Sequence, residues 1–283
     1  MQRKNTGTTP TTLLPAGSID SHIHIYSRDY PDQPGGPASP PDFPGLDEYQ
    51  KVQKWLGLGR VVIVQANAHQ RDNSCLLNAL GHFGENSRGI ACIRPDTHES
   101  TLNTYHQQGV RAARIMNLGG ATRLDDLLSV NALVQDFKWS CIVQFDGNQI
   151  DSHAALLQQI QGDYVLDHQG KFFEPISVNS PEFSTLLKLI DKGNCYLKLA
   201  GCYETSKSGY PDYADLGVTA KVLIAHAPER IIWGSNWPHV SLAPSDTPCD
   251  AQLLDTVCSW MPNAKVLQKI FVENPAKLYG FDK

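Results

Sequence analysis

The chain has 283 residues, of which 41% are hydrophobic and 19% are charged, and its formal net charge at pH 7 is −5. This length suits a single α/β barrel, which typically needs about 250 residues. The sequence has no basic block, so we expect no binding to nucleic acid or to an acidic membrane, and small molecules are the expected partners. No apolar run is long enough to cross a membrane.

Residues 1–16 are polar and lack the apolar stretch of a signal peptide. We therefore expect a flexible N-terminal tail at 1–16 and one barrel domain at 17–283. The seven cysteines are scattered without a CxxC pair, which is typical of reduced thiols and of a cytoplasmic protein. The sequence leaves open whether the protein is a monomer or a small homo-oligomer.

Eight short apolar runs rich in β-branched residues follow one another, and segments with helical spacing lie between them. This alternation predicts a parallel sheet with crossover helices. The predicted strands are 18–25, 60–67, 88–95, 110–117, 140–147, 163–170, 195–202 and 230–237. The predicted helices are 47–57, 72–83, 98–108, 124–137, 151–160, 181–192, 214–226, 250–260 and 263–271. Eight strands predict an α/β fold of the (β/α)₈ TIM barrel type, since an open doubly wound sheet usually has about six.

The segment 28–45 is rich in Pro and Gly and follows directly after the first predicted strand. One interpretation is a solvated linker. The other is a rigid loop over the mouth of the barrel, because long ordered loops in compact domains are often lids.

Polar residues gather where the predicted strands end, which is where barrel enzymes carry their reacting groups. These residues are His22, His24, Asn67, His69, Arg114, Asn117, Gln144, Asp146, Asn148, Asp167, His168, Lys198, Tyr203, Glu204, Asn236 and His239. Core packing does not require so many titratable groups. We therefore predict an active site at this end of the barrel.

The spacing of the histidines predicts where their side chains point. His22 and His24 are two residues apart on a strand, so they share one face and can converge. Asp167 and His168 are adjacent, so on a strand they would point in opposite directions, with His168 directed inward. A structural histidine that only satisfies hydrogen bonds is the alternative for His168.

A metal site requires more than paired imidazoles. Hydrolytic zinc generally takes three or more imidazole or carboxylate ligands and keeps a bound water. His168 could be a third ligand, but Asn236 offers an amide where a carboxylate would be needed, and Arg114 would repel a dication. We therefore expect no metal cofactor, with a divalent ion such as zinc as the alternative.

The predicted substrate-binding residues surround these histidines. Arg114 lies among small apolar neighbours and is predicted to clamp a substrate carboxylate, with an ion pair to a neighbouring strand as the alternative. Tyr203 either binds substrate or packs. The other predicted substrate contacts are Asn117, Gln144 and His239.

Six motifs in this order resemble one known group of enzymes. They are "DSHIHIY", "RAARIMN", "VLDHQGKFF", "LAGCYETS", "WGSNWPH" and "ENPAKLYG". The set resembles the amidohydrolase superfamily, in the branch of 2-pyrone-4,6-dicarboxylate lactonase, and within that branch the galactarolactone isomerases. The resemblance covers nearly the whole chain after residue 16.

The resemblance implies a distorted barrel that acts on a lactone of a sugar acid without a metal. In the lactonases the strand-eight position is an Asp that activates water, whereas this chain has Asn236. The motifs imply catalytic roles for His22, His24, His168 and Asn236, with Arg114 on the substrate carboxylate. The implied reaction converts a 1,5-lactone to a 1,4-lactone, so that a hydroxyl of the substrate replaces water as the nucleophile.

The histidines would polarise the carbonyl and transfer the proton, and the Asn236 amide would orient the reacting groups. Three alternatives stay open at the level of sequence. One is a lactone hydrolase whose base is His168 or His24. The others are a metal-dependent hydrolase or decarboxylase, and an inactive barrel that only binds a carboxylated ligand.

Overall fold

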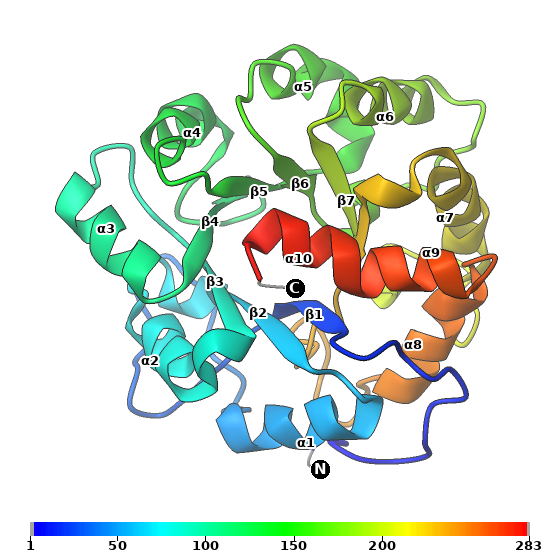
Figure 1. Cartoon of the computed structure of the whole chain (residues 1–283), viewed down its shortest axis with the longest axis horizontal. Helices are drawn as coiled ribbons and strands as arrows, with labels where there is room; N and C mark the ends of the chain where they lie inside the picture. The colour runs from blue at the N-terminus through cyan, green and yellow to red at the C-terminus, as the bar shows by residue number, and fades with distance from the viewer. Residues whose placement is uncertain (1–2, 282–283) are drawn as a thin grey trace.

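The computed structural model describes residues 3–281, and it consists of a ring of eight parallel strands surrounded by helices (Figure 1). The strands pair in chain order, from β1 to β8. They are β1 (Ile19–Ile23), β2 (Arg60–Val64), β3 (Ser87–Ala91), β4 (Val110–Met116), β5 (Ser140–Gln144), β6 (Tyr164–Leu166), β7 (Cys195–Leu199) and β8 (Ile231–Trp233). The predicted (β/α)₈ barrel is confirmed, although every strand ends earlier than predicted.

The helices also lie where the spacing predicts them, except for the last, which begins after the last predicted helix. They are α1 (Leu46–Leu56), α2 (Ser74–Phe83), α3 (Glu99–Gln107), α4 (Leu127–Val134), α5 (Ile150–Leu157), α6 (Pro181–Asp191), α7 (Ala214–His226), α8 (Asp250–Ser259), α9 (Ala264–Gln268) and α10 (Asn274–Tyr279). The segment predicted as one helix at 263–271 continues through a π-helical stretch, Lys269–Glu273, into α10. Pro275 lies in the first turn of α10, where a missing N–H costs little. No helix among residues 3–281 is long and apolar enough to cross a membrane.

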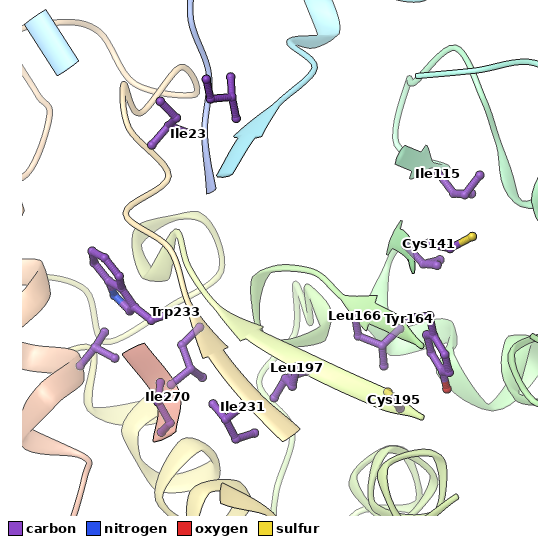
Figure 2. Close-up of a cluster of buried hydrophobic side chains, with 14 of the residues drawn as sticks. Ile23, Ile115, Cys141, Tyr164, Leu166, Cys195, Leu197, Ile231, Trp233 and Ile270 are labelled. Atoms are coloured by element: carbon purple, nitrogen blue, oxygen red, sulfur yellow. The ribbon is translucent and has the colours of Figure 1, made fainter. Parts of the chain in front are cut away.

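Alternate residues of the strands point outward and pack against the helices. Figure 2 shows Ile23, Ile115, Leu166, Leu197 and Trp233 in this outer core, and all five are buried. Because the helices cover the outer face and side chains fill the inside, the strands are apolar on both faces. This explains why they appear in the sequence as continuous apolar runs.

The inside of the ring changes from apolar to polar along the strands. Its apolar layer comprises Ile19, Val62, Val64, Ile90, Ala112, Ile142, Val165, Tyr196 and Ile232. This layer packs against Leu278, Tyr279 and Phe281 near the end of the chain, and α10 lies across that opening of the ring (Figure 1). The side chains that line the candidate site lie at the opposite opening, at the carboxyl ends of the strands.

The ring closes between β1 and the residues that follow β8. The backbone N–H of Asn236 donates to the carbonyl of His22, and the N–H of His24 donates to the carbonyl of Trp237, each at 2.9 Å. Backbone hydrogen bonds thus hold Asn236 directly beside the two histidines.

Two buried residues make this closure possible. The Asp20 carboxylate accepts from the backbone N–H of Ser235 at 2.9 Å and from its hydroxyl at 2.6 Å. Gly234 leaves room for the neighbouring strand, since a Cβ there would lie 2.5 Å from Cβ of His22. A side chain at position 234 would therefore push β1 and β8 apart.

The N-terminal segment contacts the outer helices. The indole of Trp55 in α1 donates to the carbonyl of Thr8 at 2.9 Å. The backbone N–H groups of Thr11 and Thr12 donate to the carboxylate of Asp255 in α8. A domain boundary at residue 17 stays a prediction.

Replacing Gly234 with Ala should destabilise the barrel by about 1–3 kcal/mol, because the new methyl group must displace the backbone of β1. The matched control is Gly81→Ala in α2, where a Cβ would meet nothing within 4 Å. This change should raise stability by up to about 1 kcal/mol, because Ala is the better helix former. Urea unfolding of each variant and of the wild type measures these two changes in the free energy of unfolding. Equal midpoints for Gly234→Ala and the wild type would contradict this account of the closure.

Candidate active site

A cavity of about 320 Å³ opens at the carboxyl ends of the strands. Its lining residues are His24, Tyr26, Pro37, Ala38, Asn67, Arg114, Met116, Gln144, His168, Lys171, Glu204, Asn236, Val240 and Ser241. This volume suits a small molecule. Pro37 and Ala38 belong to the segment 28–45, so this segment is a loop at the mouth of the barrel.

His22 and His24 converge as their spacing predicts. Their Nε2 atoms lie 3.2 Å apart, and Nδ1 of His24 lies 2.9 Å from the carbonyl oxygen of Val64. Burial, together with the charge of Arg114, lowers the pKa of His24 to about 3. Burial also holds the pKa of His22 well below its ordinary value. Both imidazoles are therefore neutral near pH 7.

The carbonyl of Val64 fixes which nitrogens carry hydrogen. A carbonyl oxygen only accepts, so His24 carries its proton on Nδ1, and its Nε2 accepts from the Nε2–H of His22. Nδ1 of His22 is then an acceptor, and Nζ of Lys198 lies 3.1 Å from it. In this arrangement neither histidine has an N–H left for a ligand.

Lys198 is fully buried inside the barrel and pairs with Asp167. Its Nζ lies 3.3 Å from Oδ1 of Asp167. Burial favours a neutral Asp167 carboxyl, but the charge of Lys198 and the neighbouring His168 outweigh burial and hold its pKa well below the ordinary value. Sequence reasoning noted both residues but selected neither as a site residue. The available signal was a lysine between two leucines in the strand "CYLKL".

The structure corrects the prediction that Asp167 and His168 point in opposite directions. Nδ1 of His168 lies 3.3 Å from Oδ2 of Asp167. The alternation of side chains ends with β6 at Leu166, and the backbone then turns with φ +51° at His168. His168 lines the cavity as predicted, but it does so from a turn and not from a strand.

This turn is held in an unusual backbone conformation. His168, Gln169, Gly170 and Lys171 all have positive φ, which L-residues with side chains rarely adopt. The turn is anchored from behind, where the backbone N–H of Gly147 donates to the carbonyl of Lys171 at 3.0 Å. Such strain is typical of functional sites, because the surrounding structure must maintain it.

A second ion pair lies on the other side of His168. Glu204 pairs with Lys171, and its Oε2 lies 3.7 Å from Nε2 of His168. Burial favours a neutral Glu204, but the charges of His168 and Lys171 and the hydrogen bonds from Lys171 and Asn236 outweigh burial and hold its pKa at about 2. Sequence reasoning did not select Glu204, although it follows closely after β7.

Asn236 acts as a donor toward two neighbours. Its Nδ2 donates to the hydroxyl of Tyr203 at 2.8 Å and to Oε1 of Glu204 at 3.2 Å. Behind Tyr203, the hydroxyl lies 2.9 Å from Nδ1 of His239, whose Nε2 lies 3.0 Å from Oδ1 of Asp250. The structure thus places His239 behind Tyr203 and not in the lining of the cavity.

The remaining predicted residues divide into two groups. Arg114 and Gln144 line the cavity. Nη1 of Arg114 donates to the carbonyl of Gln65, and Nε2 of Gln144 lies 3.5 Å from Nδ1 of His168. Asn117 is not part of this lining, and its side-chain oxygen accepts from Arg123 at 3.4 Å.

One group of side chains could hold a metal ion. The donor atoms of His22, Asp167 and His168 all lie within 4.8 Å of one another. The surroundings fit a divalent ion poorly, however, because Lys198 already contacts both His22 and Asp167. Asn236 adds an amide, which is a weak ligand for zinc.

The fold and this site are those of a barrel enzyme, and the chain belongs to the amidohydrolase family, which it matches over residues 19–281. It is 42% identical over 280 residues to D-galactarolactone isomerase of Agrobacterium fabrum (strain C58 / ATCC 33970), covering 98% of this chain and 96% of the relative. It is 31% identical to 4-sulfomuconolactone hydrolase of Hydrogenophaga intermedia, covering 95% and 90%. A crystal structure of an Agrobacterium tumefaciens protein in its apo form superposes with a TM-score of 0.96 at 42% identity, covering 99% of each chain.

The low pKa of Glu204 predicts how the free energy of unfolding depends on pH. A carboxylate whose pKa falls from 4.5 to about 2 on folding stabilises the fold above pH 4.5, and this contribution is lost as the pH falls through that interval. Glu204→Gln removes the titrating group. The variant should therefore lose less free energy of unfolding than the wild type between about pH 5 and about pH 3.

Urea unfolding at each pH makes this comparison. The control is Glu174→Gln, since Glu174 is solvent-exposed and lies 3.6 Å from the ammonium of Lys207. It should follow the wild-type curve. Parallel curves for the wild type and Glu204→Gln would show that the fold does not depend on this charge.

Proposed function

We propose that the protein isomerises a 1,5-lactone of a sugar acid to the 1,4-lactone, a reaction like that named for its relative from Agrobacterium fabrum. The observation that carries the proposal is Asn236. It follows β8, at the position where the resemblance to the lactonases implies an Asp, and its amide donates to Tyr203 and Glu204. An amide in this position cannot take a proton from water.

The reaction needs no water. A hydroxyl oxygen of the substrate attacks the carbonyl carbon of its own lactone, and the bond from that carbon to the ring oxygen then breaks. The proton of the attacking hydroxyl ends on the released alkoxide, so the product is an isomer. Because both groups belong to one molecule, correct orientation replaces an encounter between two molecules.

We assign the proton transfer to His168. The carboxylate of Asp167 lies beside Nδ1 of His168 and orients the ring. Nε2 of His168 lies 3.7 Å from Oε2 of Glu204, which is beyond hydrogen-bond distance, so this nitrogen can contact a substrate hydroxyl. Arg114 binds the free carboxylate of the substrate. Asn236 orients the reacting carbonyl and donates to the developing oxyanion.

The other predicted residues complete the site. His22 and His24 act as neutral rings that shape the floor of the cavity, because their N–H groups are already used. Gln144 and Tyr203 contact the substrate or hold the groups that do so. The protein needs no metal for this chemistry, and it acts as a cytoplasmic enzyme on a small lactone.

Hydrolysis of a lactone is the second candidate. Glu204 is the observation that favours it, because this carboxylate lines the cavity and could activate water in place of the missing Asp. The similarity to a protein named 4-sulfomuconolactone hydrolase also supports this second candidate.

Proton NMR of aldaric and aldonic acid lactones in ¹⁸O-water separates the two reactions. Isomerisation should give a second lactone before any free acid, with no ¹⁸O in the product by mass spectrometry. Hydrolysis would give the free acid first, with one ¹⁸O in its carboxyl group, and that result would overturn the isomerase proposal. A lactone incubated without protein corrects for spontaneous conversion.

The variant Asn236→Asp tests the role of the amide. A carboxylate at this position would lie beside Oε1 of Glu204, where Asn236 now donates at 3.2 Å. Two adjacent carboxylates share a proton, so the single variant should hydrolyse weakly. The double variant Asn236→Asp/Glu204→Gln removes this conflict and should raise the ratio of hydrolysis to isomerisation by about tenfold or more. An unchanged ratio in a folded double variant would contradict the role of Asn236.

A further inference from the structure

The barrel interior contains a cation that the proposed reaction does not use. Lys198 projects inward from β7 and is fully buried. Its ammonium lies 3.1 Å from Nδ1 of His22 and 3.3 Å from Oδ1 of Asp167. These are two of the three donor groups of the possible metal cluster, and the third is His168.

The two donor atoms need a cation between them. Nδ1 of His22 lies 3.3 Å from Oδ1 of Asp167. The hydrogen-bond chain through His24 to Val64 leaves that nitrogen without a proton, so two acceptors face each other. Two lone pairs at this distance repel unless a positive group lies beside both. Lys198 supplies this positive group from within the chain.

An ammonium and a divalent ion cannot both occupy this position. Zinc would bind the same imidazole lone pair and the same carboxylate oxygen at about 2.0–2.2 Å. It would then lie within a few ångströms of a buried like charge, where little water screens the repulsion. The two cations are therefore alternatives.

We propose that Lys198 is a built-in replacement for a metal ion: it positions His22 and Asp167 and excludes divalent cations from the cluster. Lys198 is a positioning residue, since it lies beneath the cavity lining and acts through its two partners. Metal binding is measured without substrate. The proposal can therefore fail while the isomerase function holds, and it can hold while that function fails.

The test is zinc binding to the full-length wild type and to Lys198→Met. Methionine has similar length but neither charge nor donor, so it leaves both acceptors open. Competition with a chromophoric chelator should give weak binding to the wild type. The variant should bind roughly one equivalent of zinc about tenfold more tightly or better, and with Co²⁺ it should show the visible absorption of a nitrogen-ligated site.

The matched control is Lys171→Met. It removes the other buried ammonium of the site, which pairs with Glu204 and not with His22. Its zinc affinity should equal that of the wild type. Tight zinc binding by the wild type, equal gains in both variants, or no gain in a Lys198→Met protein that is folded by circular dichroism would each overturn the proposal.

A measurement on the wild type decides the question if Lys198→Met does not fold. ¹⁵N NMR of the histidine rings, assigned with His22→Gln, should show His22 protonated on Nε2 and unprotonated on Nδ1. Adding zinc should leave these signals unchanged. A zinc-dependent shift of the Nδ1 signal of His22 would show that Lys198 does not exclude the metal.

Discussion

The buried ion pair between Lys198 and Asp167 is the interaction on which the rest of the site depends. Moving each ion out of water costs several kcal/mol, and only close partners offset that cost. Lys198 finds His22 as a second partner, and Asp167 finds His168. The pair therefore fixes two of the four predicted catalytic residues, His22 and His168.

The closure of the ring fixes the other two. Backbone hydrogen bonds join His24 and Asn236 across the gap between β1 and the residues that follow β8. The carboxylate of Asp20 accepts a hydrogen bond from the backbone N–H of the adjoining Ser235. Gly234 sets how closely β1 and β8 approach. The position of the Asn236 amide is thus a consequence of barrel closure, so a defect at Asp20 or Gly234 would also move the group that is proposed to distinguish isomerisation from hydrolysis.

The sequence was a good guide wherever a regular period applied. Eight apolar runs predicted eight strands, because strands buried on both faces are apolar throughout, and the spacing of His22 and His24 predicted their convergence. The alternation of side chains gave a wrong prediction at His168, because β6 ends at Leu166. In the left-handed turn that follows, neighbouring side chains do not point to opposite faces. Contacts between strands, such as Lys198 with His22, depend on register and depth in the barrel, which one sequence does not contain.

Glu204 was noted among the polar residues at the strand ends but was not selected as a site residue, for a related reason. A carboxylate after a strand is common, and only the folded chain shows that it meets Lys171 and Asn236 across the cavity. Its presence changes the interpretation of the site. A base is available even though position 236 carries an amide, so Asn236 alone does not explain why water would not react.

The charge of the whole site supplies the missing part of the explanation. Arg114, Lys171 and Lys198 are cationic, while Asp167 and Glu204 are anionic and the buried rings of His22 and His24 are neutral. Lys171 and Lys198 each neutralise one carboxylate, which leaves Arg114 as the one excess cation among these groups. A lactone with a single free carboxylate would balance that charge and place its reactive ring between Arg114 and His168. Glu204, held by Lys171 and Asn236, then serves to position donors, because a carboxylate with a pKa of about 2 is a weak base for water.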